Sequence, residues 1–312
     1  MRIIVALLLC SFSILGFAQT PTDPSYLKGL ELVKANKSHK AIKEFTKAID
    51  KNPIEYVFFV ERAKCHFDLQ NYQDAYNDLT ESLKIKPKND YVYLLLSRLF
   101  FAVNNKQEAI NNADMALKYA SVDSIRKEAN LVRADAKSGL QAHKDACEGY
   151  KKVLLYDSLN IAALNNIAMS LLELNKATEG LTYLDRIVRF DSLNLAATCN
   201  YGYIYQKLGD YSKSINYYKK ALKIEPNNFI ALNNLGYSKF LNGNVEEGLL
   251  DVNASIKINA TNAFAYRNRA LIYLKQEEKE KACTDLYLAK ALGFTDQYGK
   301  EVENLIDEHC KK

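Results

Sequence analysis

The chain has 312 residues, of which 48% are hydrophobic and 25% carry a charge, and its formal net charge is +5. This composition is typical of a protein that is packed throughout, and it excludes a chain that is disordered over most of its length. The Lys and Arg residues are spread along the sequence without a dense cluster, which argues against a nucleic-acid-binding surface.

The N-terminus has the features of a secretory signal. Arg2 supplies a short positive head, residues 3–17 form an almost uncharged apolar run, and Gly16 and Ala18 are the small residues that signal peptidase requires. The run is shorter than the roughly 20 residues that span a bilayer, which favours cleavage over a permanent anchor. We therefore expect a signal peptide at residues 1–18. The mature protein would then be periplasmic or extracellular, without a membrane span, and association with the cell envelope remains open.

Beyond the signal, the sequence repeats itself every 34 residues. Four asparagines share one register, and three prolines share another. The best-defined unit contains Tyr201, Gly202, Tyr205, Gly209, Asp210, Tyr211, Ser214, Tyr218, Ala221 and Pro226. The asparagines are Asn166, Asn200, Asn234 and Asn268, and the prolines are Pro53, Pro87 and Pro226.

These residues and their spacing resemble the tetratricopeptide repeat (TPR) family. The resemblance implies an all-α, right-handed superhelical solenoid of about eight helix-turn-helix units, with a C-terminal capping helix. A small residue such as Gly202 would let two helices cross closely, and Pro226 would end the second helix. The array would cover residues 22–296, with a capping helix and tail at 296–312. Its units would lie near 22–55, 56–89, 90–123, 127–160, 161–194, 195–228, 229–262 and 263–296.

One departure from the period precedes the fourth unit. Ser124, Ile125 and Arg126 are additional to the 34-residue step. We expect weaker packing there, with a hinge or a change of superhelical pitch near residues 120–127. The alternative is a simple loop insertion that the array tolerates.

The mature chain would hold an odd number of cysteines, without a dense disulfide framework. Cys283 lies on the second helix of the last unit and Cys310 at the end of the antiparallel capping helix, so the hairpin could join them in a disulfide. The alternative is that both are buried as small apolar side chains. The other cysteines, in non-adjacent units, are expected to be core residues: Cys65, Cys147 and Cys199.

Motifs for catalysis are missing from the sequence. It contains no glycine-rich phosphate loop, no G-x-S-x-G, no H-E-x-x-H and no paired C-x-x-C. Its histidines belong to different units and would not converge on a metal ion. We expect a protein that is not an enzyme and that needs neither a cofactor nor a metal.

The resemblance also implies a binding surface, because the first helices of TPR units line the concave face. The four asparagines of the shared register lie there, and their side chains could bind a peptide backbone through both a donor and an acceptor. Tyr203, Tyr237 and Arg267 lie nearby. The alternative is that the asparagines bond only between adjacent helices. The N-terminal half of this face is expected to be apolar and to suit an apolar helix or segment, with Val57, Val60, Phe67, Tyr91, Leu94 and Phe101.

The sequence thus favours a protein–protein interaction scaffold or adaptor that binds an extended peptide or partner segment in the concave groove. The partner's identity is not encoded in any recognisable motif. One alternative is a structural subunit of a cell-envelope or secretion assembly that packs through its convex face and termini. A second is an auxiliary subunit that presents a substrate to a separate enzyme.

Overall fold

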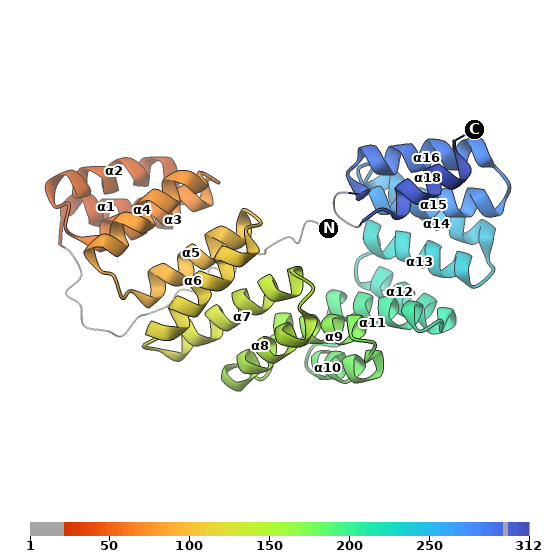
Figure 1. Ribbon diagram of the computed structural model, residues 1–312, viewed down its shortest axis with the longest axis horizontal. Coiled ribbons are helices and arrows are strands. Elements are labelled where there is room, and N and C mark those ends of the chain that lie inside the picture. The colour runs from red at the N-terminus through yellow and green to blue at the C-terminus, as the bar shows by residue number, and fades with distance from the viewer. Residues whose placement is uncertain (1–21, 296–298, 312) are drawn as a thin grey trace.

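The computed structural model describes residues 22–295 and 299–311. The predicted signal peptide, residues 1–18, therefore lies outside the described part of the chain. The described residues form an all-α, right-handed superhelical solenoid without a β-strand, and its helical hairpins stack into an open arch (Figure 1). None of the described helices is both long enough and apolar enough to pass through a bilayer.

The array consists of antiparallel helix pairs that follow one another along the chain, with one further helix packed on the last pair. The pairs are α1 (Pro24–Lys34) with α2 (Ser38–Lys51), α3 (Tyr56–Asp68) with α4 (Tyr72–Ile85), α5 (Asp90–Ala102) with α6 (Lys106–Tyr119), α7 (Asp123–Gly139) with α8 (His143–Tyr156), α9 (Ile161–Glu173) with α10 (Ala177–Phe190), α11 (Leu195–Lys207) with α12 (Tyr211–Ile224), α13 (Phe229–Leu241) with α14 (Val245–Ile258), and α15 (Ala263–Lys275) with α16 (Lys279–Ala291), followed by α18 (Glu301–His309).

The turn within each hairpin has a residue of positive φ followed by the same backbone hydrogen bond. Between α11 and α12, Gly209 has a φ of +77°, the left-handed conformation that ends many helices. The N–H of Asp210 then donates to the carbonyl oxygen of Tyr205 at 3.0 Å, and the Asp210 side chain accepts from the N–H of Lys213 at the start of α12. The other hairpins also place a residue of positive φ at this point: Asn36, Gln70, Asn104, Gln141, Asn175, Gly243 and Glu277.

Small residues allow the two helices of a hairpin to approach closely. Between α13 and α14, a Cβ added to Gly236 would lie 2.6 Å from the carbonyl oxygen of Gly248, and a Cβ added to Gly248 would lie 2.6 Å from that of Gly236. The two helices therefore pack backbone against backbone. Between α5 and α6, Ser97 takes the small position, and its buried hydroxyl donates to the carbonyl oxygen of Ala109 at 2.8 Å. The Ser97 hydroxyl therefore keeps a hydrogen-bond partner where the two helices cross closely.

The alternative of a simple loop insertion before the fourth unit is wrong. Residues 124–126 lie inside α7, which has 17 residues where α5 and α9 have 13 each. The short break before α7 is fastened by two contacts: the N–H of Ser121 donates to Asp90 at 2.9 Å, and the Arg126 guanidinium donates to the carbonyl oxygen of Ala120 at 2.7 Å. The extra residues lengthen a helix because that helix continues the backbone hydrogen-bond pattern without exposing new polar groups. A hinge near residues 120–127 stays a prediction.

The C-terminal helix α18 covers the end of the stack. Its Val302 and Ile306 are buried in one apolar cluster with Phe294 and with residues of α15 and α16. A disulfide joins Cys283 of α16 to Cys310, which directly follows α18, with a Cα–Cα distance of 5.6 Å. The last hairpin therefore has an apolar and a covalent connection to its cap.

Candidate functional site

The inner face of the arch is formed by the first helices of the hairpins. First helices of successive hairpins contact one another, as α5 does with α7, α9 with α11 and α13 with α15. Contacts between successive first helices curve the stack toward them, so these helices line the concave side (Figure 1). Any groove in this molecule is therefore lined by the odd-numbered helices from α1 to α15.

The residues predicted to bind a partner all lie on four successive first helices. Asn268 is buried, with 3% of its surface exposed, and the other six are half-buried. Asn166 is on α9, Asn200 and Tyr203 are on α11, Asn234 and Tyr237 are on α13, and Arg267 and Asn268 are on α15.

Three of the four asparagines form hydrogen bonds sideways, from one first helix to the next, whereas Asn234 accepts from Asn233 within α13 at 3.1 Å. The amide of Asn200 donates to the side-chain oxygen of Asn165 at 2.9 Å, which joins α11 to α9. The amide of Asn268 donates to the side-chain oxygen of Asn233 at 3.0 Å, which joins α15 to α13. The amide of Asn166 donates to Asp135 of α7 at 2.9 Å. These bonds link neighbouring first helices and help to set their spacing. Each bond also uses part of the hydrogen-bonding capacity of an asparagine within the array.

The junction between α11 and α13 uses a different pair. Gln206 donates from its side-chain amide to the hydroxyl of Ser238 at 2.7 Å, and Ser238 in turn shares a 2.8 Å hydrogen bond with Ser214 of α12. Sequence reasoning missed both Gln206 and Asp135 as members of this polar row. The signal for Gln206 was available, because it lies in the stretch of α11 that also carries Tyr203.

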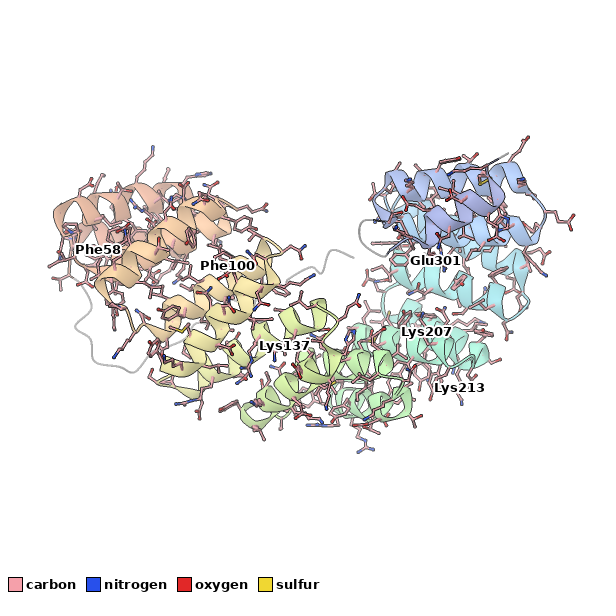
Figure 2. All side chains as sticks on the ribbon, in the orientation of Figure 1. Phe58, Phe100, Lys137, Lys207, Lys213 and Glu301 are labelled. Atoms are coloured by element: carbon pink, nitrogen blue, oxygen red, sulfur yellow. A yellow bond between two sulfur atoms is a disulfide. The ribbon has the colours of Figure 1, made fainter. Side chains whose placement is uncertain are left out.

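Two aromatic rings on this face each have a cation over them. The Lys207 ammonium lies 5.4 Å from the ring centre of Tyr203, and the Arg267 guanidinium lies 5.1 Å from that of Tyr237. Arg267 also donates to Asn268 at 2.7 Å and to Glu301, the first residue of α18. Lys207 and Glu301 both belong to the C-terminal half of the array (Figure 2). The cap thus holds one cation of the inner face in place.

Asp135 is a carboxylate at the middle of the inner face. Its Oδ1 accepts from the Tyr150 hydroxyl at 2.7 Å and from the Asn166 amide at 2.9 Å, both neutral donors. No Lys, Arg or His of the described residues forms an ion pair with it. Burial raises the pKa of Asp135 from 3.8 to about 6, while the two hydrogen bonds oppose this rise.

The N-terminal half of the inner face is less apolar than expected. Val60 and Leu94 are buried in the core, whereas Val57, Phe67, Tyr91 and Phe101 are half-buried. Two ion pairs also occupy this region: Lys64 lies 2.8 Å from Glu61, and Arg98 lies 2.7 Å from Glu128. Part of the apolar surface that the sequence predicted therefore lies in the core. The two ion pairs interrupt the part that stays accessible.

The three free thiols of the described residues are unsuited to nucleophilic chemistry. Cys65 and Cys147 are buried and Cys199 is half-buried. Burial raises the pKa of Cys65 and of Cys199 to about 12, which keeps both thiols protonated at neutral pH. Among residues 22–295 and 299–311, no group of three or more His, Cys, Asp or Glu side chains could hold a metal ion.

Comparison with known families agrees with this architecture. Two family models match, one described as "Tetratricopeptide repeat" over residues 26–90 and one described as "TPR repeat" over residues 202–243. The Hsp70/Hsp90 co-chaperone CNS1 of Saccharomyces cerevisiae is 28% identical over 155 residues, which are 45% of this chain and 39% of that protein. The heat shock protein STI1 of the same yeast is 32% identical over 90 residues, 28% of this chain and 15% of that protein. The chain thus spans well under half the length of either relative.

Solved structures match over more of the chain. A tetratricopeptide repeat protein from Parabacteroides merdae superposes with a TM-score of 0.72 at 19% identity, over 80% of this chain and 98% of that one. Yeast Tom70 superposes with a TM-score of 0.63 at 17% identity, over 95% of this chain and 66% of that one. At these identities the likeness establishes the fold.

Proposed function

We propose that this tetratricopeptide repeat protein is a non-enzymatic adaptor that holds an extended segment of a partner protein along the inner face of its C-terminal half. The observation that carries the proposal is the row of half-buried polar and aromatic side chains on α9, α11 and α13. Side-chain amides can bond a peptide backbone without reading its sequence, and tyrosines add rigid contact area with a polar end. The row consists of Asn166, Asn200, Asn234, Tyr203 and Tyr237.

Within this site the residues have different parts. Asn200 and Asn166 each use an amide N–H for a neighbouring helix, and the amide oxygen of each is left for a ligand N–H. Arg267 donates to Asn268 and to Glu301 of the cap, and Asn268 donates to Asn233 of α13, so we assign the two residues to holding α15 in place against α13 and α18. The partner would therefore lie mainly against α9, α11 and α13.

Site-specific crosslinking tests where the partner binds. A photoreactive phenylalanine analogue placed at Tyr203 or at Tyr237, in cells of the source organism, should crosslink the same protein from both positions. The matched control is Tyr287 of α16, which is exposed on a second helix. A partner captured only from Tyr287 would contradict the proposal and would favour a subunit that packs through its outer face.

A pair of variants then separates binding from helix spacing. Asn200→Ala removes the lateral bond to Asn165 and also the polar group on the inner face, whereas Asn165→Ala removes the same bond from a buried position. We expect Asn200→Ala to weaken binding of the captured partner by about tenfold relative to Asn165→Ala, measured by calorimetry. Equal affinities would assign Asn200 to the array alone.

We further propose that the chain works outside the cytoplasm. The predicted signal peptide and the disulfide between Cys283 and Cys310 support this, because disulfides persist in oxidising compartments. Fractionation of cells that express the tagged full-length chain should place the shortened product outside the inner membrane. A full-length product in the cytosol would refute the assignment.

A further inference from the structure

Two successive hairpins end in the same short motif, an aromatic residue followed by Asp-Ser-Leu-Asn. The motif spans residues 156–160 after α8 and residues 190–194 after α10. In each copy the aromatic residue and the leucine are exposed, and Phe190 and Leu193 are 68% and 69% exposed. Leu155, beside the first copy, is 82% exposed. We call these five side chains the apolar edge: Leu155, Tyr156, Leu159, Phe190 and Leu193.

The polar residues of the motif form the hydrogen bonds of the turn, and the apolar residues take no part in them. Asp191 accepts from the N–H of Leu193 at 3.2 Å and from the Asn194 amide at 3.0 Å, and Asn194 accepts from the N–H of Ala197 to begin α11. The leucine contributes no side-chain hydrogen bond to this turn. In the next two units its position is taken by polar residues, Asn227 and Thr261.

One hydrogen bond joins α10 to the loop of the first copy. The Arg186 guanidinium of α10 donates to the carbonyl oxygen of Ser158, in the loop of the first copy, at 2.5 Å. Helices α8 and α10 lie on the outer side of the arch, away from its opening (Figure 1). The apolar edge therefore lies where the C-terminal ends of α8 and α10 meet the loops that lead to α9 and α11.

The charges around the apolar edge are unbalanced. Asp157 lies 3.5 Å from Lys127 and accepts from Asn160, while Asp191 is occupied by its turn. Lys152 and Arg189 are exposed, and neither has an ion-pair partner among the residues that the structure describes. Asp157 is thus paired with a cation, whereas Asp191 keeps its negative charge because it accepts only from uncharged N–H groups. The two unpaired cations outnumber this one unpaired carboxylate, so the five residues, with Lys127 included, carry a net positive charge.

We propose that the apolar edge seats the array on an anionic lipid surface. Large apolar side chains next to free cations are what binding to the interface of an anionic membrane requires. Leu155, Phe190 and Leu193 protrude, and a lipid interface accepts protruding side chains because it needs no complementary shape. A second copy of the chain is a poorer occupant, since pairing two apolar edges would bring their unpaired cations together. The inner face would remain open above the lipid.

Vesicle flotation of the full mature chain tests this. The wild-type chain should float with vesicles of mixed phosphatidylglycerol and phosphatidylcholine, and several-fold less with pure phosphatidylcholine. The double variant Phe190→Ser/Leu193→Ser should lower the partition coefficient on the mixed vesicles by about tenfold or more. Lys152→Gln/Arg189→Gln should lower it on the mixed vesicles alone. The matched control is Leu250→Ser on α14, because Leu250 is 68% exposed outside the apolar edge and its loss should leave flotation unchanged.

Three outcomes would overturn the proposal. The wild-type chain could fail to float with the mixed vesicles, or the Phe190→Ser/Leu193→Ser variant could float as well as the wild type. In the third, the double variant changes the sedimentation coefficient of the chain in the absence of vesicles, which would assign the apolar edge to contact between copies. Circular dichroism of each variant establishes that it has folded, and the fold should be intact because the substituted side chains are exposed.

Discussion

At the scale of single residues, the carboxylate of Asp135 is an unfavourable arrangement on the inner face. It is held by two neutral donors and no cation, and burial raises its pKa to about 6. Because the carboxyl binds its proton more tightly in the folded chain than in the unfolded chain, folding takes up a proton between about pH 4 and pH 6. The free energy of unfolding should therefore fall as the pH rises through that window.

The variant Asp135→Asn tests this sign. It keeps an acceptor for Tyr150 and removes the buried charge, so it should stabilise the protein above pH 6 by at most about 3 kcal/mol and should have little effect at pH 4. Urea unfolding at both pH values measures the difference. Asp145→Asn is the control, because that exposed carboxylate of the same hairpin pairs with Lys137. A stabilisation of equal size at both pH values would show that the charge of Asp135 is not the cause.

For the asparagines of the inner face, the sequence predicts the helix on which each one lies but does not predict its hydrogen-bond partner. The 34-residue register predicts that Asn200 and Asn268 lie on first helices, and they do. The register does not predict that their amides bond to Asn165 and Asn233, because the direction of an amide depends on the offset between neighbouring hairpins. That offset is set by packing between units that are one period apart, and the local sequence does not encode it.

At the scale of elements, helix pairing follows from periodicity, whereas helix length does not. The hairpins form at the predicted spacing because a small residue and a left-handed turn residue recur in each unit. Residues 124–126 break the period, and the period alone cannot tell a longer loop from a longer helix. The structure extends α7, where Arg126 bonds to the carbonyl oxygen of Ala120.

The capping helix α18 provides the prediction at this scale. Cys283 and Cys310 are 27 residues apart, so their bond should stabilise the cap by about 3 to 4 kcal/mol, largely by restricting the unfolded chain. Cys310→Ser should therefore raise amide hydrogen exchange in α18 and at the end of α16, as measured by mass spectrometry. Cys199→Ser, which leaves the disulfide intact, is the control. Unchanged exchange in the Cys310→Ser variant would mean that Val302 and Ile306 hold the cap without the bond.

At the scale of the whole molecule, the two proposed surfaces are built by different elements of one arch. The inner face is built by first helices, and the apolar edge lies at the ends of the second helices α8 and α10. The two surfaces have no residue in common. A partner segment on the inner face and a lipid surface under the apolar edge could therefore be bound at the same time, and loss of one should leave the other intact.

The arch also predicts how the protein unfolds. Each hairpin contacts only its neighbours, so stability should be a sum of local terms and should not be shared equally by all residues. Phe45 of α2 and Leu184 of α10 are both fully buried, and truncating either to Ala should cost about 2 to 5 kcal/mol. Phe45→Ala should raise hydrogen exchange in α1 to α4 and leave α9 to α16 as in the wild type. Leu184→Ala, in the middle, should raise it on both sides of α10. If both variants raised exchange uniformly along the chain, the array would be one cooperative unit, and partner binding at any hairpin would stabilise all of them.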